Sequence, residues 1–469
     1  MCTSSQFDHD SFRILLFRCD ALEILLETAG YALRAPAVRI PRHTRAAKEI
    51  TSVISISWNL KTYCLFTLCQ SDSSDRPIRY YVVEICRPEA ELPAGMQWIP
   101  VASLSAPAFE DLSDFAALQN SISTLERYRR GELSGPFGKL GWLQTVKEWV
   151  QSEAAKVSLR LTGEFCQLNA SPTFSLVRFS TNGPAIWFKA VGEPNLREYP
   201  ITLALSRYFP AHTPQVLATR DEWNGWLVIE VEGTHPDENS NLEVWRQVAT
   251  TLADLQIASV GQTLHLLDIG CRDARVCSLL ELIEPFFEMM AELMEQQTKE
   301  SPPPLSRDQL SVLRTRLQDI LSEAAESEIP NAIGRLDFNP GNIVTNHDRC
   351  VFLDWAEACA GQPFLTFQYL LQHLRRLRQK DDSWERTLTS AYLDHWYSFS
   401  SPGEVAKALR ISPLLAVFAY AVCGDSWRNP ASPTYPQTAP YLRSLVRRMK
   451  READLLAVDE TRRSVPCPG

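Results

Sequence analysis

Three oxygen-bearing side chains stand close together in the C-terminal half of the chain, with a spacing that could serve catalysis. Asp337 lies on a loop that Pro340 and Gly341 would hold tightly. Asn342 opens a short apolar run, and Asp354 closes the next apolar run after a polar turn, so the pattern predicts a β-hairpin over 342–354. Antiparallel pairing about that turn would bring Asn342 and Asp354 together at the open end of the hairpin.

This set of residues suits transfer of a phosphoryl group to a hydroxyl. We predict Asp337 as the carboxylate that orients the hydroxyl and takes its proton. Asn342 and Asp354 are the predicted ligands of Mg²⁺, because this ion prefers hard oxygen donors. The alternative is that all three are turn and strand-end residues, where Asp and Asn are common.

The segment resembles the catalytic loop of the aminoglycoside phosphotransferase and choline kinase-like family, which belongs to the kinase-fold group. The matching residues are Asp337, Pro340, Gly341, Asn342, Leu353, Asp354 and Trp355, followed by Gly361 and Pro363. The resemblance covers roughly 155–455. It implies a bilobal fold with an antiparallel-sheet N-lobe and a mostly helical C-lobe, ATP and Mg²⁺ as cofactors, and a small hydroxylated molecule as substrate.

Besides Asn339, which replaces the His that usually precedes the Pro, the sequence departs from the family pattern at three supporting positions. Arg335 replaces the family's His two residues before the catalytic Asp, and Leu336 replaces the Gly between them. Thr366 stands where the family has an acidic residue. These departures favour an alternative function, a kinase-fold binding or regulatory module with weak or no catalysis.

The family also implies nucleotide-binding residues upstream. Lys189 lies on a predicted strand and would hold the α- and β-phosphates, and Glu198, at the start of a predicted helix, would fix that Lys. The alternatives are a solvent-facing strand Lys and a Glu favoured by the helix dipole. Ser171 and Thr173 lie on the expected phosphate-covering loop. Backbone groups near Glu230 and Val231 would recognise adenine.

The acceptor side is less marked in the sequence. The candidates are Glu357, Asp394 and Trp427, although each could equally be a core or surface residue. An acidic wall of this kind would favour a cationic acceptor. Two basic runs are interpreted as solvated helix faces: Arg375, Arg376, Arg378 and Lys380, and Arg447, Arg448 and Lys450.

The helices and strands that we expect to position these residues indicate an α+β protein with a bilobal kinase-like part. We expect an accessory α+β domain over 1–130, a linker and helix over 131–154, a nucleotide-binding N-lobe over 155–233, a helical C-lobe over 234–457 and a tail over 458–469. Asn-Gly pairs at 182–183 and 224–225 predict two tight hairpins in the N-lobe, because Asn and Gly suit the positive φ angles of a tight turn.

Hydrophobic spacing predicts the remaining elements. Within 1–130 we expect a helix over 14–29 and strands over 53–58, 63–69 and 78–86. In the C-lobe we expect helices over 278–297, 307–325, 363–379, 384–398, 403–422 and 437–457.

The composition restricts the partners. A formal charge of −9 argues against nucleic acid. The 12 Cys form no C-x-x-C pair, no signal peptide is evident, and the longest apolar stretch, 414–423, is short for a membrane span. We therefore expect a cytoplasmic protein without a membrane partner. The N-terminal segment is the candidate for homodimerisation or for binding another protein.

Overall fold

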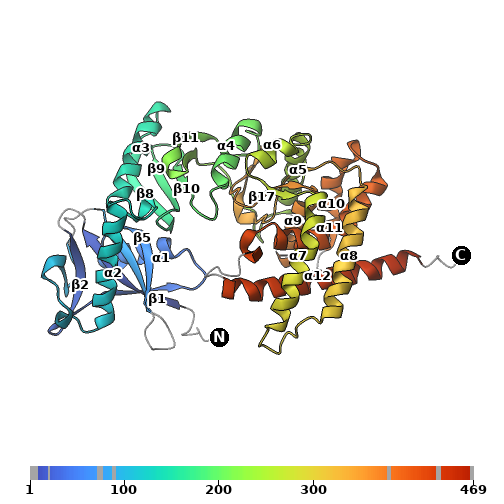
Figure 1. Ribbon diagram of the computed structural model, residues 1–469. Coiled ribbons are helices and arrows are strands. Elements are labelled where there is room, and N and C mark those ends of the chain that lie inside the picture. Colours follow the sequence, from blue (N-terminus) through green and yellow to red (C-terminus); the bar gives the residue numbers. More distant parts are fainter. Residues whose placement is uncertain are drawn as a thin grey trace, which may run out of the picture. The chain divides into compact units, whose positions relative to one another are not determined.

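The computed structural model describes residues 9–18, 22–70, 78–86, 91–377, 382–428 and 435–464. The chain divides into two compact units, one made of 1–199 and 215–230, the other of 200–214 and 231–469. The first unit is rich in sheet and the second is mostly helical (Figure 1). The predicted α+β class, with a sheet-rich N-terminal part and a helical C-terminal part, is confirmed.

The first unit begins with a seven-stranded sheet whose main path runs β3-β2-β1-β6-β5, while β4 pairs with β1 and β7 with β2. Its strands are β1 (His9–Arg18), β2 (Glu23–Ala29), β3 (Ala32–Arg34), β4 (Ala37–Pro41), β5 (Thr62–Gln70), β6 (Ile78–Ile85) and β7 (Met96–Pro100). Three helices accompany it: α1 (Ala46–Trp58), α2 (Leu112–Arg129) and α3 (Trp142–Lys156).

Two predictions for this sheet are wrong. The run 14–29 forms parts of two paired strands, β1 and β2, and the run 53–58 lies in α1. The β-branched residues of the second run suggested a strand, but Ala47, Ile50, Ile54 and Trp58 recur at helical spacing and are the buried face of α1. The strands predicted over 63–69 and 78–86 are confirmed as β5 and β6.

A five-stranded antiparallel sheet follows in the same unit, in the order β11-β12-β10-β9-β8. Its strands are β8 (Leu161–Ala170), β9 (Ser175–Thr181), β10 (Ile186–Ala190), β11 (Val216–Arg220) and β12 (Gly225–Ile229). Both predicted hairpins are present. Asn224 adopts a φ of 44°, but neither Asn182 nor Gly183 has a positive φ, because Pro184 and Ala185 lengthen that loop beyond a two-residue turn.

The two sheets of this unit share one core. Tyr63 of β5 packs on Trp142, Trp142 on Phe137 and Phe137 on Phe188 of β10, with ring centroids 5.5, 5.2 and 5.7 Å apart. The Gln167 side chain bonds both backbone groups of Cys64, at 2.7 and 3.0 Å. The boundary predicted at 130 therefore does not separate two cores, because the Gly-rich segment 131–141 also carries the buried Phe137.

The second unit packs its helices around one large core. They are α5 (Leu242–Ala258), α6 (Thr263–Asp268), α7 (Val276–Glu295), α8 (Arg307–Ala325), α9 (Phe364–Leu377), α10 (Asp382–Asp394), α11 (Pro402–Val422) and α12 (Tyr435–Ser464). The six helices predicted between 278 and 457 are confirmed. The tail predicted from 458 is wrong as far as 464, because α12 continues through it.

The helical unit is interrupted by five short strands, two of which form the hairpin that the sequence predicted. β13 (Arg272–Ala274), β17 (Ala358–Gly361) and β14 (Ala332–Arg335) form one sheet, and β15 (Ile343–Thr345) pairs with β16 (Cys350–Phe352). Helix α4 (Glu198–Tyr208) connects the two units along the chain, with Pro200 in its first turn.

One helix of the described part, α11, is long and apolar enough to cross a membrane by length and composition alone. Of its apolar window, 67% is buried inside the protein, which is typical of a core helix. The cytoplasmic location stays a prediction.

Candidate active site

The loop after β14 carries Asp337 and is tied at both ends. The Leu336 amide donates to the Glu357 carbonyl over 3.0 Å, which fixes the backbone just before Asp337. Asn339 caps a single 3-10 turn, Pro340–Asn342: its side chain accepts from the Gly341 amide at 2.9 Å. Leu336 and Phe338 are buried, while Asp337 between them is exposed. The loop thus directs the Asp337 carboxylate away from the core.

The hairpin has the register that the sequence predicted. Ile343 faces Phe352, and the Leu353 amide donates to the Asn342 carbonyl over 2.8 Å. Asn342 and Asp354 therefore both lie at the open end of the hairpin. Asp354 has a φ of 62°, a left-handed conformation in which Asp is one of the better tolerated residues. This turn of the backbone ends the strand and leaves the Asp354 side chain exposed.

Two of the three departures from the family pattern support each other. The Thr366 hydroxyl accepts from the Arg335 amide at 2.8 Å and donates to the Arg335 carbonyl at 3.2 Å. Both residues are buried. Thr366 sits directly over Gly334, where an added Cβ would lie 2.5 Å from its hydroxyl. Helix α9 therefore holds the strand that leads into Asp337 through one neutral hydroxyl.

The Arg335 side chain takes a position among aromatic rings. Its guanidinium lies over the Trp355 ring at 5.2 Å and over the Phe338 ring at 5.6 Å from their centroids. Cation–π contact of this kind stabilises a desolvated Arg. Arg335 therefore joins the catalytic loop to the residue after Asp354.

In the first unit, Lys189 and Glu198 form the predicted ion pair. Lys189 Nζ lies 2.5 Å from Glu198 Oε1, and the two side chains are only 14% and 2% exposed. The Trp226 ring lies 5.8 Å from the ammonium. Because both side chains are nearly inaccessible to solvent, the ion pair holds the Lys189 side chain in one position on β10.

The other predicted nucleotide residues are placed as follows. The Ser171 hydroxyl accepts from the Phe174 amide at 2.9 Å, which forms a tight turn before β9. Thr173 packs so closely on Gly192 that a Cβ there would lie 2.3 Å from the Thr173 Cβ. Both residues therefore shape a compact loop, and their contact with a phosphate stays a prediction.

Glu230 has structural partners for its side chain and its amide. Arg178 binds the carboxylate through two nitrogens, at 2.6 and 2.7 Å, and these hydrogen bonds hold the pKa of Glu230 below its ordinary value. The Glu230 amide donates to the Ala185 carbonyl over 2.8 Å. The Glu230 amide is therefore occupied by the fold, and adenine recognition by other backbone groups near Glu230 and Val231 stays a prediction. Val231, the next residue, keeps its predicted role as a proposal only.

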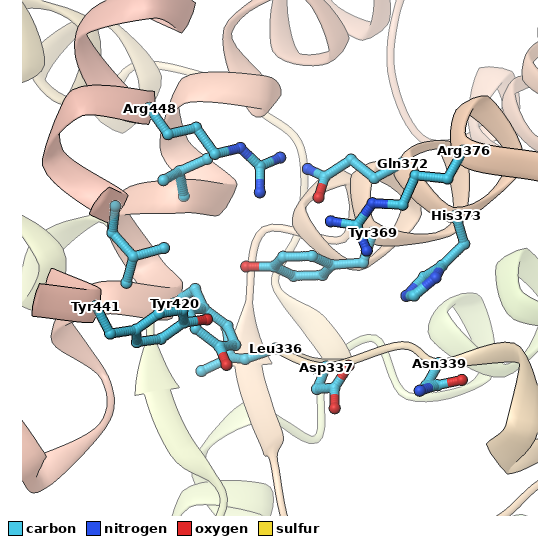
Figure 2. A pocket seen from close by; sticks show the side chains of 12 residues that line it. Leu336, Asp337, Asn339, Tyr369, Gln372, His373, Arg376, Tyr420, Tyr441 and Arg448 are labelled. Atoms are coloured by element: carbon cyan, nitrogen blue, oxygen red, sulfur yellow. The ribbon is translucent and has the colours of Figure 1, made fainter. Parts of the chain in front are cut away.

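A cavity of about 260 Å³ opens beside Asp337 in the second unit. Helices α9 and α12 supply much of its wall, and Figure 2 shows their side chains around the Asp337 carboxylate. The polar lining residues are Asp337, Asn339, Tyr369, Gln372, His373, Arg376, Tyr420, Tyr441 and Arg448.

None of the three predicted acceptor residues lines this cavity. Glu357 is paired with Arg272, whose Nη2 lies 3.1 Å from Oε2. Trp427 is buried and donates its ring N–H to the Val422 carbonyl at 2.8 Å, so it belongs to the core. Asp394 is exposed at the end of α10.

The residues that the sequence interpretation missed are basic. Arg376 and Arg448 belong to the two basic runs that were interpreted as solvated helix faces. Arg376 is exposed, in agreement with that interpretation, and Arg448 is half-buried, but both also line the cavity. The signal was helical spacing: Tyr369, Gln372, His373 and Arg376 fall on one face of α9. Burial, with Arg376 as a second cause, lowers the pKa of His373, which favours its neutral form.

Residues 194–400 match the family model described as the phosphotransferase enzyme family. This segment of the chain is therefore similar to the phosphotransferase enzyme family. The match includes Glu198, the loop with Asp337 and the hairpin that ends in Asp354. It stops before α11 and α12, so most of the basic cavity wall on α12 lies outside it.

Solved structures similar to this chain come from several organisms. Macrolide 2'-phosphotransferase MphH from Brachybacterium faecium is 14% identical, with 63% of this chain and 96% of that one covered and a TM-score of 0.40. Choline kinase from Cryptosporidium parvum is 13% identical, with 66% and 97% covered and a TM-score of 0.44. Ethanolamine kinase from Plasmodium vivax is 13% identical, with 74% and 91% covered and a TM-score of 0.43. A search among curated proteins finds no match.

Proposed function

We propose that this protein transfers the γ-phosphate of ATP to a hydroxyl group of a small molecule. The observation that carries the proposal is the position of Asp337, an exposed carboxylate in the wall of a cavity, on a loop tied to the hairpin that presents Asn342 and Asp354. The match to a phosphotransferase family over this segment supports it.

In the proposed reaction, the Asp337 carboxylate orients the acceptor hydroxyl and takes its proton. The acceptor oxygen forms a bond to the γ-phosphorus, the bond to the β–γ bridging oxygen breaks, and ADP leaves. Lys189, held by Glu198, would contribute a positive charge to the α- and β-phosphates. The work of the protein is positioning and charge neutralisation.

The donor atoms at the hairpin end fit a magnesium ion. An amide oxygen from Asn342 and a carboxylate from Asp354 are hard ligands, and Mg²⁺ takes one or two protein oxygens together with substrate phosphates and water. Within the described residues, no cluster of three or more His, Cys, Asp or Glu side chains offers a fuller protein cage. The ion would supply charge neutralisation at the phosphates.

The alternative, a regulatory module without catalysis, rested on Arg335, Leu336 and Thr366. The hydroxyl of Thr366 bonds both backbone groups of Arg335, so the loop keeps a support without the family's acidic residue. This favours catalysis over the alternative.

The test is ATP turnover by the full chain over a panel of hydroxylated small molecules. Asp337→Asn keeps the volume and removes the base, so we expect acceptor-dependent turnover to fall by roughly 10²- to 10⁴-fold. Asp348→Asn, at the exposed turn of the same hairpin, is the matched control and should leave turnover unchanged. Undiminished turnover in Asp337→Asn, with its melting temperature preserved, would refute the assigned role.

A further inference from the structure

The cavity beside Asp337 is lined by positively charged side chains. Phosphoryl transfer to a hydroxyl does not by itself require these charges. Arg376 projects from α9 and Arg448 from α12, and both guanidiniums belong to the cavity wall. Asp337 is the acidic residue among the described lining residues. Since burial favours the neutral form of His373, two permanent positive charges stand against one carboxylate.

One carboxylate lies near Arg448, and none of the described residues forms an ion pair with Arg376. Arg448 has Glu452 one turn further along α12, but Nε and Oε1 are 3.9 Å apart, which is longer than a hydrogen bond. Burial lowers the pKa of Arg448, and Arg376 is one of the further causes. Within the described residues, Arg376 has no ion pair, whereas its neighbour Arg375, outside the cavity, pairs with Glu385.

The polar ends of these side chains converge. Figure 2 shows the guanidinium of Arg448 and the amide of Gln372 directed toward each other, with Arg376 beside them and Asp337 on the other side of the view. The Tyr369 hydroxyl is already bonded to the Ala416 carbonyl at 2.5 Å, so it serves the fold. Two guanidiniums and the Gln372 amide are the donors that converge here, and Asn339, His373, Tyr420 and Tyr441 line the rest of the cavity.

Such a group of donors matches an oxyanion. Guanidinium presents a planar fork of N–H groups that binds carboxylate or phosphate through two parallel hydrogen bonds. A cationic acceptor would instead place an ammonium beside two like charges, which costs free energy in a partly desolvated cavity. This is the reverse of the acidic wall that the sequence interpretation favoured.

We propose that the acceptor of this phosphotransferase is a small hydroxylated anion, whose phosphate or carboxylate group is bound by Arg376 and Arg448 while its hydroxyl lies at Asp337. The inference rests on the proposed function for the role of Asp337, but the anion site itself can be tested without turnover. Gln372 would contribute a further N–H donor.

The first experiment measures binding to the full chain by calorimetry, without nucleotide. The probes are glycerol 3-phosphate, glycerate, glycerol and choline, which separate a phosphate, a carboxylate, a neutral and a cationic molecule of similar size. We expect one or both anions to bind at least about tenfold more tightly than glycerol and choline, in line with charge-assisted hydrogen bonds. Equal or tighter binding of choline would overturn the inference.

The variants locate the site. Arg376→Gln and Arg448→Met, the second of which keeps the apolar stem of the side chain, should each weaken anion binding by about 10- to 100-fold. Arg375→Gln and Lys450→Gln remove neighbouring charges outside the cavity lining and should change it less than about twofold. Melting temperatures report whether each variant folds. A folded pair of cavity variants with unchanged anion affinity would contradict the assignment.

Turnover then separates the two proposals. If the acceptor KM rises in Arg376→Gln while the ATP KM is unchanged, the arginines serve the acceptor. If only the ATP KM rises, they serve the nucleotide and the inference fails, although the proposed function stands. If no acceptor is phosphorylated but the anions still bind through Arg376 and Arg448, the proposed function fails and the anion site stands.

Discussion

At the scale of single residues, the site combines a buried ion pair with exposed carboxylates. Lys189 and Glu198 are a nearly dry pair, in which each side chain satisfies the other. Asp337 and Asp354 are exposed carboxylates. The first arrangement fixes a position, and the second leaves oxygen atoms accessible to a substrate or a metal ion.

The buried pair gives a prediction about stability. Glu198→Gln removes the partner of a Lys189 side chain that is only 14% exposed, and should lower the free energy of unfolding by roughly 3 kcal/mol, because a desolvated ammonium is left without its carboxylate. Urea denaturation of Glu198→Gln, Lys189→Met and the double variant measures the coupling between them.

The exposed pair Lys61–Glu164 is the matched control for that cycle. Its side chains are 29% and 73% exposed, and Glu164→Gln should cost less than about 1 kcal/mol. If the Lys189–Glu198 cycle gave a coupling no larger than this control, the pair would not be fixing Lys189.

At the scale of elements, short strands and one helix hold the catalytic loop. β14 leads into Asp337, the β15–β16 hairpin sets the register of Asn342 against Asp354, and α9 supports β14 through Thr366. Helix α9 also carries Arg376 on its cavity face. Loop geometry and cavity charge therefore depend on the same helix.

The Thr366 hydroxyl is the point at which this support can be tested. Thr366→Val keeps the shape but removes the hydroxyl, which leaves the buried Arg335 amide and carbonyl without this partner. We expect the free energy of unfolding to fall by about 1–3 kcal/mol and turnover to fall with it.

The conservative variant distinguishes the hydroxyl from the methyl group. Thr366→Ser keeps both hydrogen bonds and should retain most of the turnover, at the cost of one buried methyl. Equal turnover in Thr366→Val and the natural protein would show that the loop does not depend on this bond.

At the scale of the whole molecule, the N-terminal 130 residues are part of the unit that carries Lys189. The ring chain Tyr63–Trp142–Phe137–Phe188 and the Gln167–Cys64 bonds join the two sheets of that unit. Glu84, 3% exposed, adds a further link: it accepts from the Tyr63 hydroxyl and, at 2.8 Å, from the Gly141 amide. A role in dimerisation or partner binding stays a proposal.

A deletion tests this view of the first unit. A chain that starts at residue 131 loses Tyr63, Glu84 and Cys64, and exposes the apolar face of Trp142 and Phe137. We expect β8–β12 to lose their cooperative thermal transition, measured by near-ultraviolet circular dichroism, and ATP binding to be lost with it. If the shortened chain melted at the temperature of the full one, the N-terminal segment would be an independent domain.

The sequence by itself predicted the local geometry of the loop and of the hairpin, and it suggested the chemistry proposed for them. Asp337, Asn342 and Asp354 could be placed because a hairpin register follows from strand length and turn position, both of which are local. The hairpins about Asn182 and Asn224 and the six later helices follow from local turn residues and local periodicities, whereas the Lys189–Glu198 pair was implied by the family resemblance.

Only the tertiary structure decided which of the polar residues surround Asp337. The sequence alone allows Glu357, Asp394 and Trp427 as acceptor-binding residues. In the structure, Glu357 forms an ion pair, Asp394 lies at the end of a helix and Trp427 packs in the core. Arg376 and Arg448 are 72 positions apart in the sequence, and no local pattern reveals that α9 and α12 line one cavity. Local spacing fixes which face of a helix a side chain occupies, while its neighbour across the cavity depends on packing between distant elements.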